Sequence, residues 1–360
     1  MMNTILVTGG HGFIGRFLVA ALLAKGETVI VMLRQPESQL PTLKAWLTTY
    51  GVNSQRLSAI YADLSQANAG VSEEDWQKLA EITVLYHTAA LFAWQLSAIQ
   101  ARQINVTAVV DLLALLSART PLRHVIQLSG YMVSLPNNLA ALGINAGEHH
   151  DWLSLYRQLG AYEASKIEAH FAIKKQCQQK GLLCTVIHPA TVIGHSQTGE
   201  LAAHQPFYHT LVDLKAGKFI AVPAGQGYRL PLVSVDYVVD FLAHVLDVPH
   251  AAGQEYVLAD NTTPDLRQVL TYCAPMLAVS APRWQLPVPL LQFIAKYRRL
   301  AACLGLSAEQ LHFLRTESLD TASADAVAQQ LGLSHPPLAA VLVKTAAYVQ
   351  HQSHNEVLMT

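Results

Sequence analysis

The sequence predicts an α/β protein in which a doubly wound parallel sheet carries a smaller, mainly helical C-terminal region. Three observations support this prediction. Short β-rich runs alternate with longer stretches whose apolar residues recur at helical spacing. The strand-like runs are nearly free of charge, as in Val29–Leu33, which suits a sheet covered on both faces. A glycine-rich turn joins the first strand to the first helix.

The elements of the first half follow one another in βαβ order, which requires crossover helices between parallel strands. Several of the predicted helices are bounded by Gly or Pro. The six predicted strands are Ile5–Thr8, Thr28–Leu33, Leu57–Tyr61, Val84–His87, His124–Leu128 and Cys184–His188. The predicted helices are Ile14–Lys25, Glu73–Leu79, Ile99–Ser117 and Ala161–Lys180.

The turn Thr8-Gly9-Gly10-His11-Gly12-Phe13-Ile14-Gly15 lies between a strand and a helix, the context that a dinucleotide-binding (Rossmann) fingerprint requires. We expect Gly9 or Gly10 to allow the sharp turn. Gly12 would let the backbone approach a pyrophosphate, and Gly15 would let the helix pack closely on the strand. The amides at the helix N-terminus then face the anion. A tight turn without a ligand is the simpler alternative.

The choice of dinucleotide is read at the end of the second strand, where NAD-binding proteins place an acidic residue for the ribose hydroxyls. Here the residues are Met32-Leu33-Arg34-Gln35, with no acid. A guanidinium such as that of Arg34 suits a 2′-phosphate, so we predict NADP(H) in preference to NAD(H). An ordinary exposed arginine after a strand is the alternative.

A tyrosine and a lysine four residues apart, Tyr162 and Lys166, open the fourth predicted helix and share one of its faces. An adjacent cation stabilises a phenolate and is expected to lower the pKa of Tyr162. Such a phenol can protonate a carbonyl oxygen or deprotonate an alcohol. Taken alone, the pair also fits a solvated helix surface.

Together these motifs resemble the extended short-chain dehydrogenase/reductase superfamily from about Thr4 to Leu270. The resemblance also rests on Ala62-Asp63-Leu64, His87-Thr88-Ala89-Ala90, Asn105-Val106, His188-Pro189-Ala190 with Gly194, and Val235-Asp236. It implies that Asp63 contacts the adenine, that Ala89 lines the cofactor and that Lys166 also holds the nicotinamide ribose. From the residues alone, Asp63 also suits a helix N-cap and Asn105 a structural amide. The expected cofactor-binding residues are Thr8, Gly9, Gly10, Gly12, Phe13, Ile14, Gly15, Arg34, Asp63, Leu64, Thr88, Ala89, Ala90, Asn105, Lys166, His188, Pro189 and Ala190.

The superfamily resemblance further implies a Ser or Thr after the fifth strand that hydrogen-bonds the substrate oxygen. One alignment places Gly130 where this hydroxyl is expected. Ser129 is the candidate for the third catalytic residue beside Tyr162 and Lys166, and Ser134 is the second choice. The sequence therefore departs from the superfamily pattern at the residue that would bind the oxyanion. Loss of such a positioned donor costs about 3 kcal/mol of transition-state stabilisation.

We expect residues 1–190 to form the NADP(H)-binding domain with the catalytic helix, and residues 191–360 to form the substrate-binding region. Segments 232–246 and 255–273 return to a strand-then-helix rhythm and are expected to rejoin the core in part. The run from Pro287 to Leu306 is apolar and interrupted by Lys296, Arg298 and Arg299. It suits a core helix or a lid over an apolar substrate, and weak contact with a membrane surface is the alternative.

The composition bears on nucleic-acid binding, cellular location and metal binding. An apolar fraction of 51% and a net charge of −1 predict a globular protein without the basic surface that nucleic acid requires. The four cysteines form no C-x-x-C pair and the N-terminus begins with a strand, which favours the cytoplasm. Sixteen histidines, among them His149, His150, His195, His204 and His209, show no metal-binding spacing, so we predict no metal.

The resulting hypothesis is an NADP(H)-dependent oxidoreductase that reduces a carbonyl, or oxidises the alcohol, of an apolar small molecule or acyl substrate. Tyr162 would act as the general acid or base. A sugar-nucleotide epimerase or dehydratase with tightly bound NAD is one alternative, and a catalytically weak dinucleotide-sensing or scaffold protein is another. A homodimer is kept open.

Overall fold

A computed structural model describes residues 3–91, 97–144, 150–219, 221–224, 229–287 and 319–358. The chain divides into two compact units. Unit 1 comprises Met1–Pro189, Val239–Val257 and Ala326–Leu331. Unit 2 comprises Ala190–Val238, Leu258–Asp325 and Gly332–Thr360.

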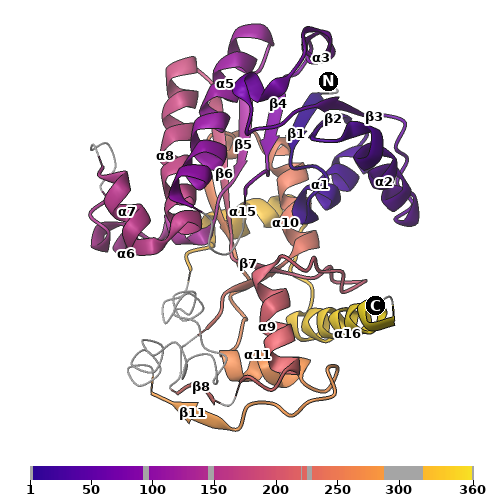
Figure 1. Ribbon diagram of the computed structural model, residues 1–360, viewed down its shortest axis with the longest axis vertical. Helices are drawn as coiled ribbons and strands as arrows, with labels where there is room; N and C mark the ends of the chain where they lie inside the picture. The colour runs from indigo at the N-terminus through magenta and orange to yellow at the C-terminus, as the bar shows by residue number, and fades with distance from the viewer. Residues whose placement is uncertain are drawn as a thin grey trace. The chain divides into compact units, whose positions relative to one another are not determined.

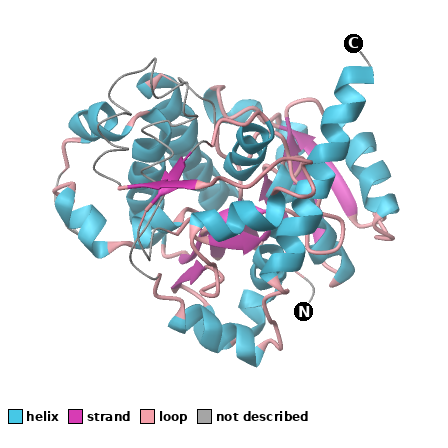
Figure 2. Cartoon of the chain, turned by 90° about the horizontal axis from the view of Figure 1, so that it is seen from below, coloured by secondary structure: helices cyan, strands magenta, loops and turns pink. Residues whose placement is uncertain are grey.

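Unit 1 contains a seven-stranded parallel sheet in the order β10-β6-β5-β4-β1-β2-β3, shown in Figure 1. Because strand order reverses at β1, the sheet is doubly wound, which confirms the predicted fold class. Figure 2 distinguishes its strands from the surrounding helices. The strands are β1 (Thr4–Thr8), β2 (Thr28–Leu33), β3 (Leu57–Tyr61), β4 (Val84–His87), β5 (His124–Leu128), β6 (Leu183–Pro189) and β10 (Glu255–Leu258).

The central strands β1, β2, β4 and β5 are buried on both sides, because helices cover both faces of the sheet. Alternate strand residues such as Leu6, Ile30 and Leu85 pack in one apolar cluster with residues of α5 (Ala108–Arg119) and α8 (Ala161–Lys180). On the other face, a Cβ added to Gly10 would contact both Val31 of β2 and Val19 of α1 (Phe13–Ala24). The remaining described helices that lie wholly in unit 1 are α2 (Pro36–Thr49), α3 (Glu73–Lys78), α4 (Ala98–Arg102), α6 (Pro136–Ala141) and α7 (Trp152–Leu159). The unit also has a π-helical turn at Gln103–Thr107 and short 3₁₀ turns at Ala67–Gly70, Tyr131–Ser134, Val245–Asp247 and Pro249–Ala251.

Unit 2 holds the smaller, mainly helical region together with two short sheets. Strand β7 (Thr191–Ile193) pairs in parallel with β9 (Leu232–Ser234), and β8 (Ala221–Pro223) pairs in parallel with β11 (Trp284–Leu286). Helix α16 packs against α9 and α11. The helices that belong wholly or partly to this unit are α9 (Pro206–Lys215), α10 (Val235–His244), α11 (Leu266–Cys273), α15 (Ala322–Gln330) and α16 (Leu338–Leu358).

One helical run, Ala98–Arg119, is long and apolar enough to cross a membrane by length and composition alone. Its residues Leu112, Leu113 and Leu116 are buried in the main apolar cluster of unit 1. That packing is typical of the core helix of a globular domain. The segment 288–306, for which we weighed a lid against membrane contact, lies outside the described residues.

Candidate functional site

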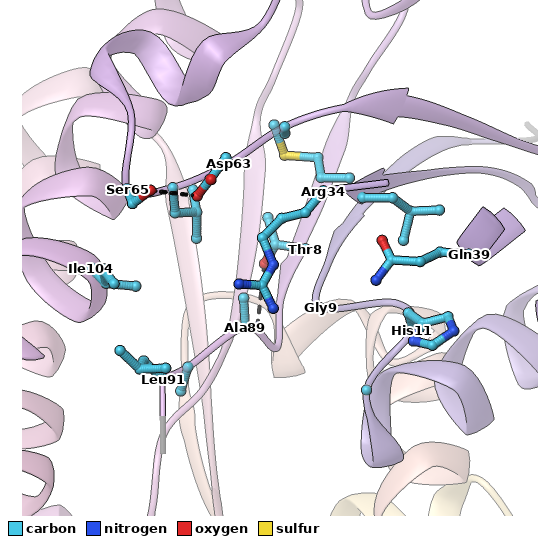
Figure 3. Close-up of a pocket in the computed structure, with 16 residues that line it drawn as sticks. Thr8, Gly9, His11, Arg34, Gln39, Asp63, Ser65, Ala89, Leu91 and Ile104 are labelled. Carbon is cyan, nitrogen blue, oxygen red and sulfur yellow. Dashed lines mark hydrogen bonds between the residues drawn. The ribbon is translucent and has the colours of Figure 1, made fainter. Parts of the chain in front are cut away.

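A cavity of about 360 Å³ lies at the carboxyl ends of strands β1 to β4, next to the point where strand order reverses. In doubly wound folds this is where ligands bind. Figure 3 shows its side chains, all of which belong to unit 1. The cavity is lined by Thr8, Gly9, His11, Gly12, Met32, Leu33, Arg34, Gln39, Ala62, Asp63, Leu64, Ser65, Ala89, Ala90, Leu91 and Ile104.

The turn after β1 needs its glycines for steric reasons. Gly9 has a φ of +73°, and a Cβ there would lie 2.8 Å from the backbone nitrogen of Ala89. A Cβ on Gly15 would lie 2.0 Å from the carbonyl oxygen of Gly9, so only glycine allows α1 to start this close to the strand. Gly12 is the N-cap of α1 and offers no side-chain cap, which leaves the first amides of the helix for a ligand.

Arg34 follows the last residue of β2 and its exposed side chain extends into the cavity (Figure 3). Asp63 lines the same cavity after β3. The Asp63 carboxylate accepts hydrogen bonds from the Ser65 backbone nitrogen at 2.9 Å and from the Ser65 hydroxyl at 2.8 Å. These bonds, the backbone one foremost, and the charge of Arg34 lower the pKa of Asp63 below its usual value despite the opposing effect of burial. A cation and an ionised carboxylate therefore flank this end of the cavity.

Thr8 and His87 join the ends of β1 and β4 beneath the cavity. The Thr8 hydroxyl and Nδ1 of His87 are 2.8 Å apart, and the Thr88 hydroxyl donates to the Thr8 carbonyl at 2.7 Å. Burial, with a smaller contribution from the charge of Lys166, lowers the pKa of His87 to about 3. The ring is therefore neutral at physiological pH and serves as a hydrogen-bond partner of Thr8.

Tyr162 and Lys166 lie in the first turns of α8, as expected from their spacing. The Lys166 ammonium donates to the carbonyl of Leu128, the last residue of β5, at 3.0 Å. Burial raises the pKa of Tyr162 to about 12 and lowers that of Lys166 to about 8. The predicted lowering of the Tyr162 pKa is therefore wrong for this structure, because burial disfavours the charged phenolate.

Asn105 connects the cavity wall to α8. Its side-chain oxygen accepts from the backbone nitrogen of Leu91 at 2.7 Å, and its amide nitrogen donates to the Ser165 hydroxyl at 3.0 Å. That hydroxyl in turn donates to the carbonyl of Tyr162 at 2.8 Å. Asn105 thus acts as a structural amide, the alternative considered above, and links the loop at Leu91 to the tyrosine.

The segment after β5 holds the two serine candidates. Oγ of Ser129 is buried and has no hydrogen-bond partner, whereas the Ser134 hydroxyl donates to the carbonyl of Tyr131 at 2.7 Å. Gly130 has an extended backbone with φ −162°, and a Cβ added there would meet no atom of the described residues within 4 Å. There is therefore room for a side chain at the position where the resemblance expects a hydroxyl.

The cavity contains some of the predicted cofactor residues and not others. Residues Thr8, Gly9, Gly12, Arg34, Asp63, Leu64, Ala89 and Ala90 line it. Phe13 instead packs edge to face on Phe17, and both ring nitrogens of His188 lie against protein oxygens. The other predicted residues that do not line it are Gly10, Ile14, Gly15, Thr88, Asn105, Lys166, Pro189 and Ala190.

The sequence prediction missed several residues that line the cavity. Gln39 comes from α2, where its side-chain oxygen accepts from the Gln35 backbone nitrogen at 3.0 Å. This helix had not been predicted, so nothing pointed to Gln39. Leu91 and Ile104 complete the wall opposite Gln39 (Figure 3), and both adjoin predicted site residues in the sequence.

The histidines considered for metal binding have other surroundings where they are described. Nδ1 of His195 accepts from the backbone nitrogens of Gln197 and Thr198 at 3.2 and 3.4 Å. The His150 ring packs edge to face on Trp152. His149 lies outside the described residues.

Residues 7–242, well over half of the chain, match a family of NAD-binding proteins described as male sterility protein. The chain belongs to this family. The match covers the glycine turn, Arg34 and the Tyr162–Lys166 pair. It also confirms the resemblance to reductases of the extended short-chain dehydrogenase/reductase type.

Three individual proteins illustrate the range of this family's relatives. L-2-aminoadipate reductase of Schizosaccharomyces pombe is 29% identical over 216 residues, which are 55% of this chain and 15% of that protein. The chain thus spans less than a fifth of that relative's length. UDP-glucose 4-epimerase of Vibrio cholerae is 24% identical over 81% of this chain and 80% of its own. The terminal R domain of the myxalamid PKS-NRPS pathway shares the fold, with a TM-score of 0.75, 24% identity, and coverage of 98% of this chain and 91% of its own.

Proposed function

We propose that the chain is an NADPH-dependent reductase of a carbonyl carbon, and that its substrate is an activated acyl group. The observation that carries the cofactor choice is Arg34, whose guanidinium enters the cavity at the end of β2, where no acidic side chain stands. A guanidinium there pairs with a 2′-phosphate, and the acid that would bind free ribose hydroxyls is missing. We also propose a cytoplasmic location, which the free thiols of Cys177, Cys184 and Cys273 support.

The cavity residues fit a dinucleotide phosphate. The uncapped N-terminus of α1 at Gly12 offers amides to the pyrophosphate, and Gly9 and Gly15 leave no room for larger residues. Arg34 would hold the 2′-phosphate, and Asp63 would contact the adenine end. When bound, NADPH supplies the hydride that reduces the carbonyl carbon.

The proton comes from Tyr162 in this proposal. With a pKa of about 12 the phenol keeps its proton at neutral pH, which is the form that a general acid requires. With a pKa of about 8 Lys166 is cationic at pH 7, and it favours the phenolate that remains after proton transfer. A thioester would then yield an aldehyde and a free thiol, with one hydride and one proton added in all.

The hydroxyl groups that could bind the oxyanion are poorly placed in this site. Ser129 is the proposed donor because its Oγ has no partner, but that atom is enclosed by protein. Ser134 already donates elsewhere. We propose that the missing hydroxyl at Gly130 limits turnover, since a positioned donor is worth about 2.7–4 kcal/mol in the transition state.

The substrate class rests on similarity to L-2-aminoadipate reductase, named for reduction of a carboxylic acid. A carboxylate resists hydride, so such a reduction needs an activated acyl group. Release of thiol in step with NADPH oxidation would support a thioester, and is measured with a thiol-reactive dye. NADPH oxidation on ketones or aldehydes with none on thioesters would refute this choice.

The cofactor proposal is tested by titrating the protein with NADPH and with NADH and following intrinsic fluorescence. Arg34→Ala is expected to weaken NADPH binding about tenfold and to leave NADH binding within twofold. Tenfold lies at the lower end of the range for a charge-assisted hydrogen bond, because Arg34 is exposed to solvent. Arg123→Ala is the matched control, since Arg123 is an exposed arginine that precedes β5. Equal loss of both cofactors, or tighter binding of NADH by the wild type, would overturn the proposal.

A sugar-nucleotide epimerase is the second candidate, because the Vibrio cholerae relative matches over most of both chains. Such an enzyme keeps NAD bound through turnover. Release of one equivalent of NAD on denaturation, with interconversion of UDP-glucose and UDP-galactose, would establish it. Protein purified without nucleotide and inert toward UDP-sugars would exclude it.

A further inference from the structure

Three side chains with metal-binding chemistry meet outside the cavity, where β6 and β10 form an edge of the sheet. They are His170 of α8, His188 of β6 and Glu255 of β10. One potential ligand atom from each lies within 4.8 Å of the others. Both histidines are buried, whereas the Glu255 side chain is 36% exposed, and all three belong to unit 1.

The contacts of His188 require a positive charge in this cluster. Its Nδ1 is 3.1 Å from the carbonyl oxygen of Gly130, and its Nε2 is 2.9 Å from Oε2 of Glu255. A carbonyl oxygen only accepts, so Nδ1 carries a proton, and the Nε2 of a neutral ring would then turn a lone pair toward the carboxylate. Either a second proton or a metal cation must lie between these two atoms.

Glu255 is ionised in this arrangement. The adjacent Lys174 ammonium and the hydrogen bond with His188 both favour the charged carboxylate. Lys174 pairs with the other oxygen, Oε1, which leaves Oε2 facing the two imidazoles.

His170 lacks the partners that a buried imidazole needs. Its Nε2 is 3.8 Å from Oε2 of Glu255, too far for a hydrogen bond, and its buried Nδ1 has no hydrogen-bond partner among the described residues. The His170 ring is 4% exposed, and a buried imidazole favours the neutral form, which has a lone pair to give. Nε2 is the nitrogen that lies beside the Glu255 carboxylate, so it is the atom that can bond a cation held there.

We propose that His170, His188 and Glu255 bind a divalent transition-metal ion, for which zinc is the best match. Two imidazoles and one carboxylate form a common zinc ligand set, with bonds of about 2.0–2.2 Å. An ion bonded to Oε2 of Glu255 would replace the proton beside His188 and give Nε2 of His170 a partner. The exposed side of Glu255 leaves an entry path and a position for water.

Neighbouring groups support these ligands as metal sites commonly require. The Gly130 carbonyl accepts from Nδ1 of His188 and so directs Nε2 toward the ion, and Lys174 orients the carboxylate through Oε1. The charge of Lys174 also opposes the cation. We therefore expect weaker binding than at a site with an unpaired carboxylate.

The metal ion would connect the catalytic helix α8 to the edge of the sheet. His170 lies one turn after Lys166 on α8, and the Lys166 ammonium donates to Leu128, two residues before Gly130. The ion would thus join the helix that carries Tyr162 to β6 and β10, with a hydrogen bond to the segment after β5. It takes no part in the reaction proposed above.

The proposal is tested on tag-free full-length protein that has been treated with a chelator and dialysed. Cobalt(II) is titrated in and followed by its visible d–d absorption, and zinc is then added in competition. We expect one equivalent of cobalt bound by nitrogen and oxygen ligands, displaced by zinc. Glu255→Gln, which keeps the side-chain volume, and His170→Gln should each weaken binding at least tenfold, whereas the exposed control His250→Gln should not change it.

Three results would overturn the proposal. The first is the absence of stoichiometric cobalt binding, which would mean that the cluster holds a proton only. The second is an unchanged cobalt affinity in folded Glu255→Gln. The third is a thiolate-to-cobalt charge-transfer band, which would mean that cysteines bind the ion. Circular dichroism identifies a variant that fails to fold, and Glu255→Gln decides the outcome if His170→Gln does fail. Because the readout is metal binding, it is independent of NADPH oxidation.

Discussion

Replacing Gly130 by serine tests whether a missing hydroxyl limits this enzyme. The backbone at Gly130 has φ −162°, which any residue adopts, and a new Cβ would have no atom within 4 Å. Substitution of glycine at such a compatible position stabilises a protein by about 0.4–1 kcal/mol, because the unfolded chain loses freedom. We expect Gly130→Ala and Gly130→Ser both to raise the midpoint of thermal unfolding, by about 0.5–1.5 °C for a chain of this size.

Activity then separates the two variants. An oxyanion donor is worth about 10²–10³ in kcat, and a hydroxyl placed without further adjustment should recover part of that. Gly130→Ser is therefore expected to raise kcat/KM for acyl or carbonyl substrates at least tenfold over Gly130→Ala, measured by NADPH oxidation. Equal rates in the two variants would refute the idea that a hydroxyl is missing, and a lower unfolding midpoint would refute the open space at Gly130.

Three further predictions concern the proton donor, its neighbour and the glycine turn. Tyr162→Phe should lower kcat by about 10²–10⁴ and leave NADPH binding within twofold, and an unchanged kcat would remove Tyr162 from the mechanism. The Lys166 ammonium is present below its pKa of about 8 and lost above it, so reductive kcat/KM should fall as the pH rises through about 8, and a flat profile from pH 7 to 9 would contradict this. Gly15→Ala places a Cβ 2.0 Å from the Gly9 carbonyl oxygen. We expect it to lower the free energy of unfolding in urea by about 1–3 kcal/mol and to abolish NADPH binding. NADPH binding as tight as that of the wild type would contradict the steric argument.

The fold was largely predictable because the central strands are buried on both faces and the six predicted strands carry no charged residue. The observed β2 and β5 coincide with the predicted residues 28–33 and 124–128. Helix α2 was missed because it contains Pro36 and Pro41 and buries only two residues, Leu43 and Leu47. Proline discourages a helix prediction, although Pro36 occupies the first turn, where it is tolerated.

The site was predictable where its chemistry follows from sequence order. The glycine turn and Arg34 adjoin strand ends, so their place at the cavity follows from the fold. The pKa of Tyr162 could not be predicted, because burial depends on distant segments that pack around it. The cluster of His170, His188 and Glu255 was missed for a similar reason, since only the pairing of β6 with β10 brings Glu255 to the histidines.

The edge strand β10 has a consequence for how the chain is made. Residues 239–257 belong to unit 1, as do residues 326–331, although residues 190–238 of unit 2 precede both segments in synthesis. Residues 239–257 supply most of β10, and also the Leu242 carbonyl that accepts from the buried Tyr86 hydroxyl at 3.0 Å. During synthesis β6, which pairs with β5 on one side, therefore stays without a strand partner on its other side until Leu258 has been made. The dinucleotide-binding unit is thus interrupted by residues 190–238 of unit 2 and cannot finish folding before those residues have been made.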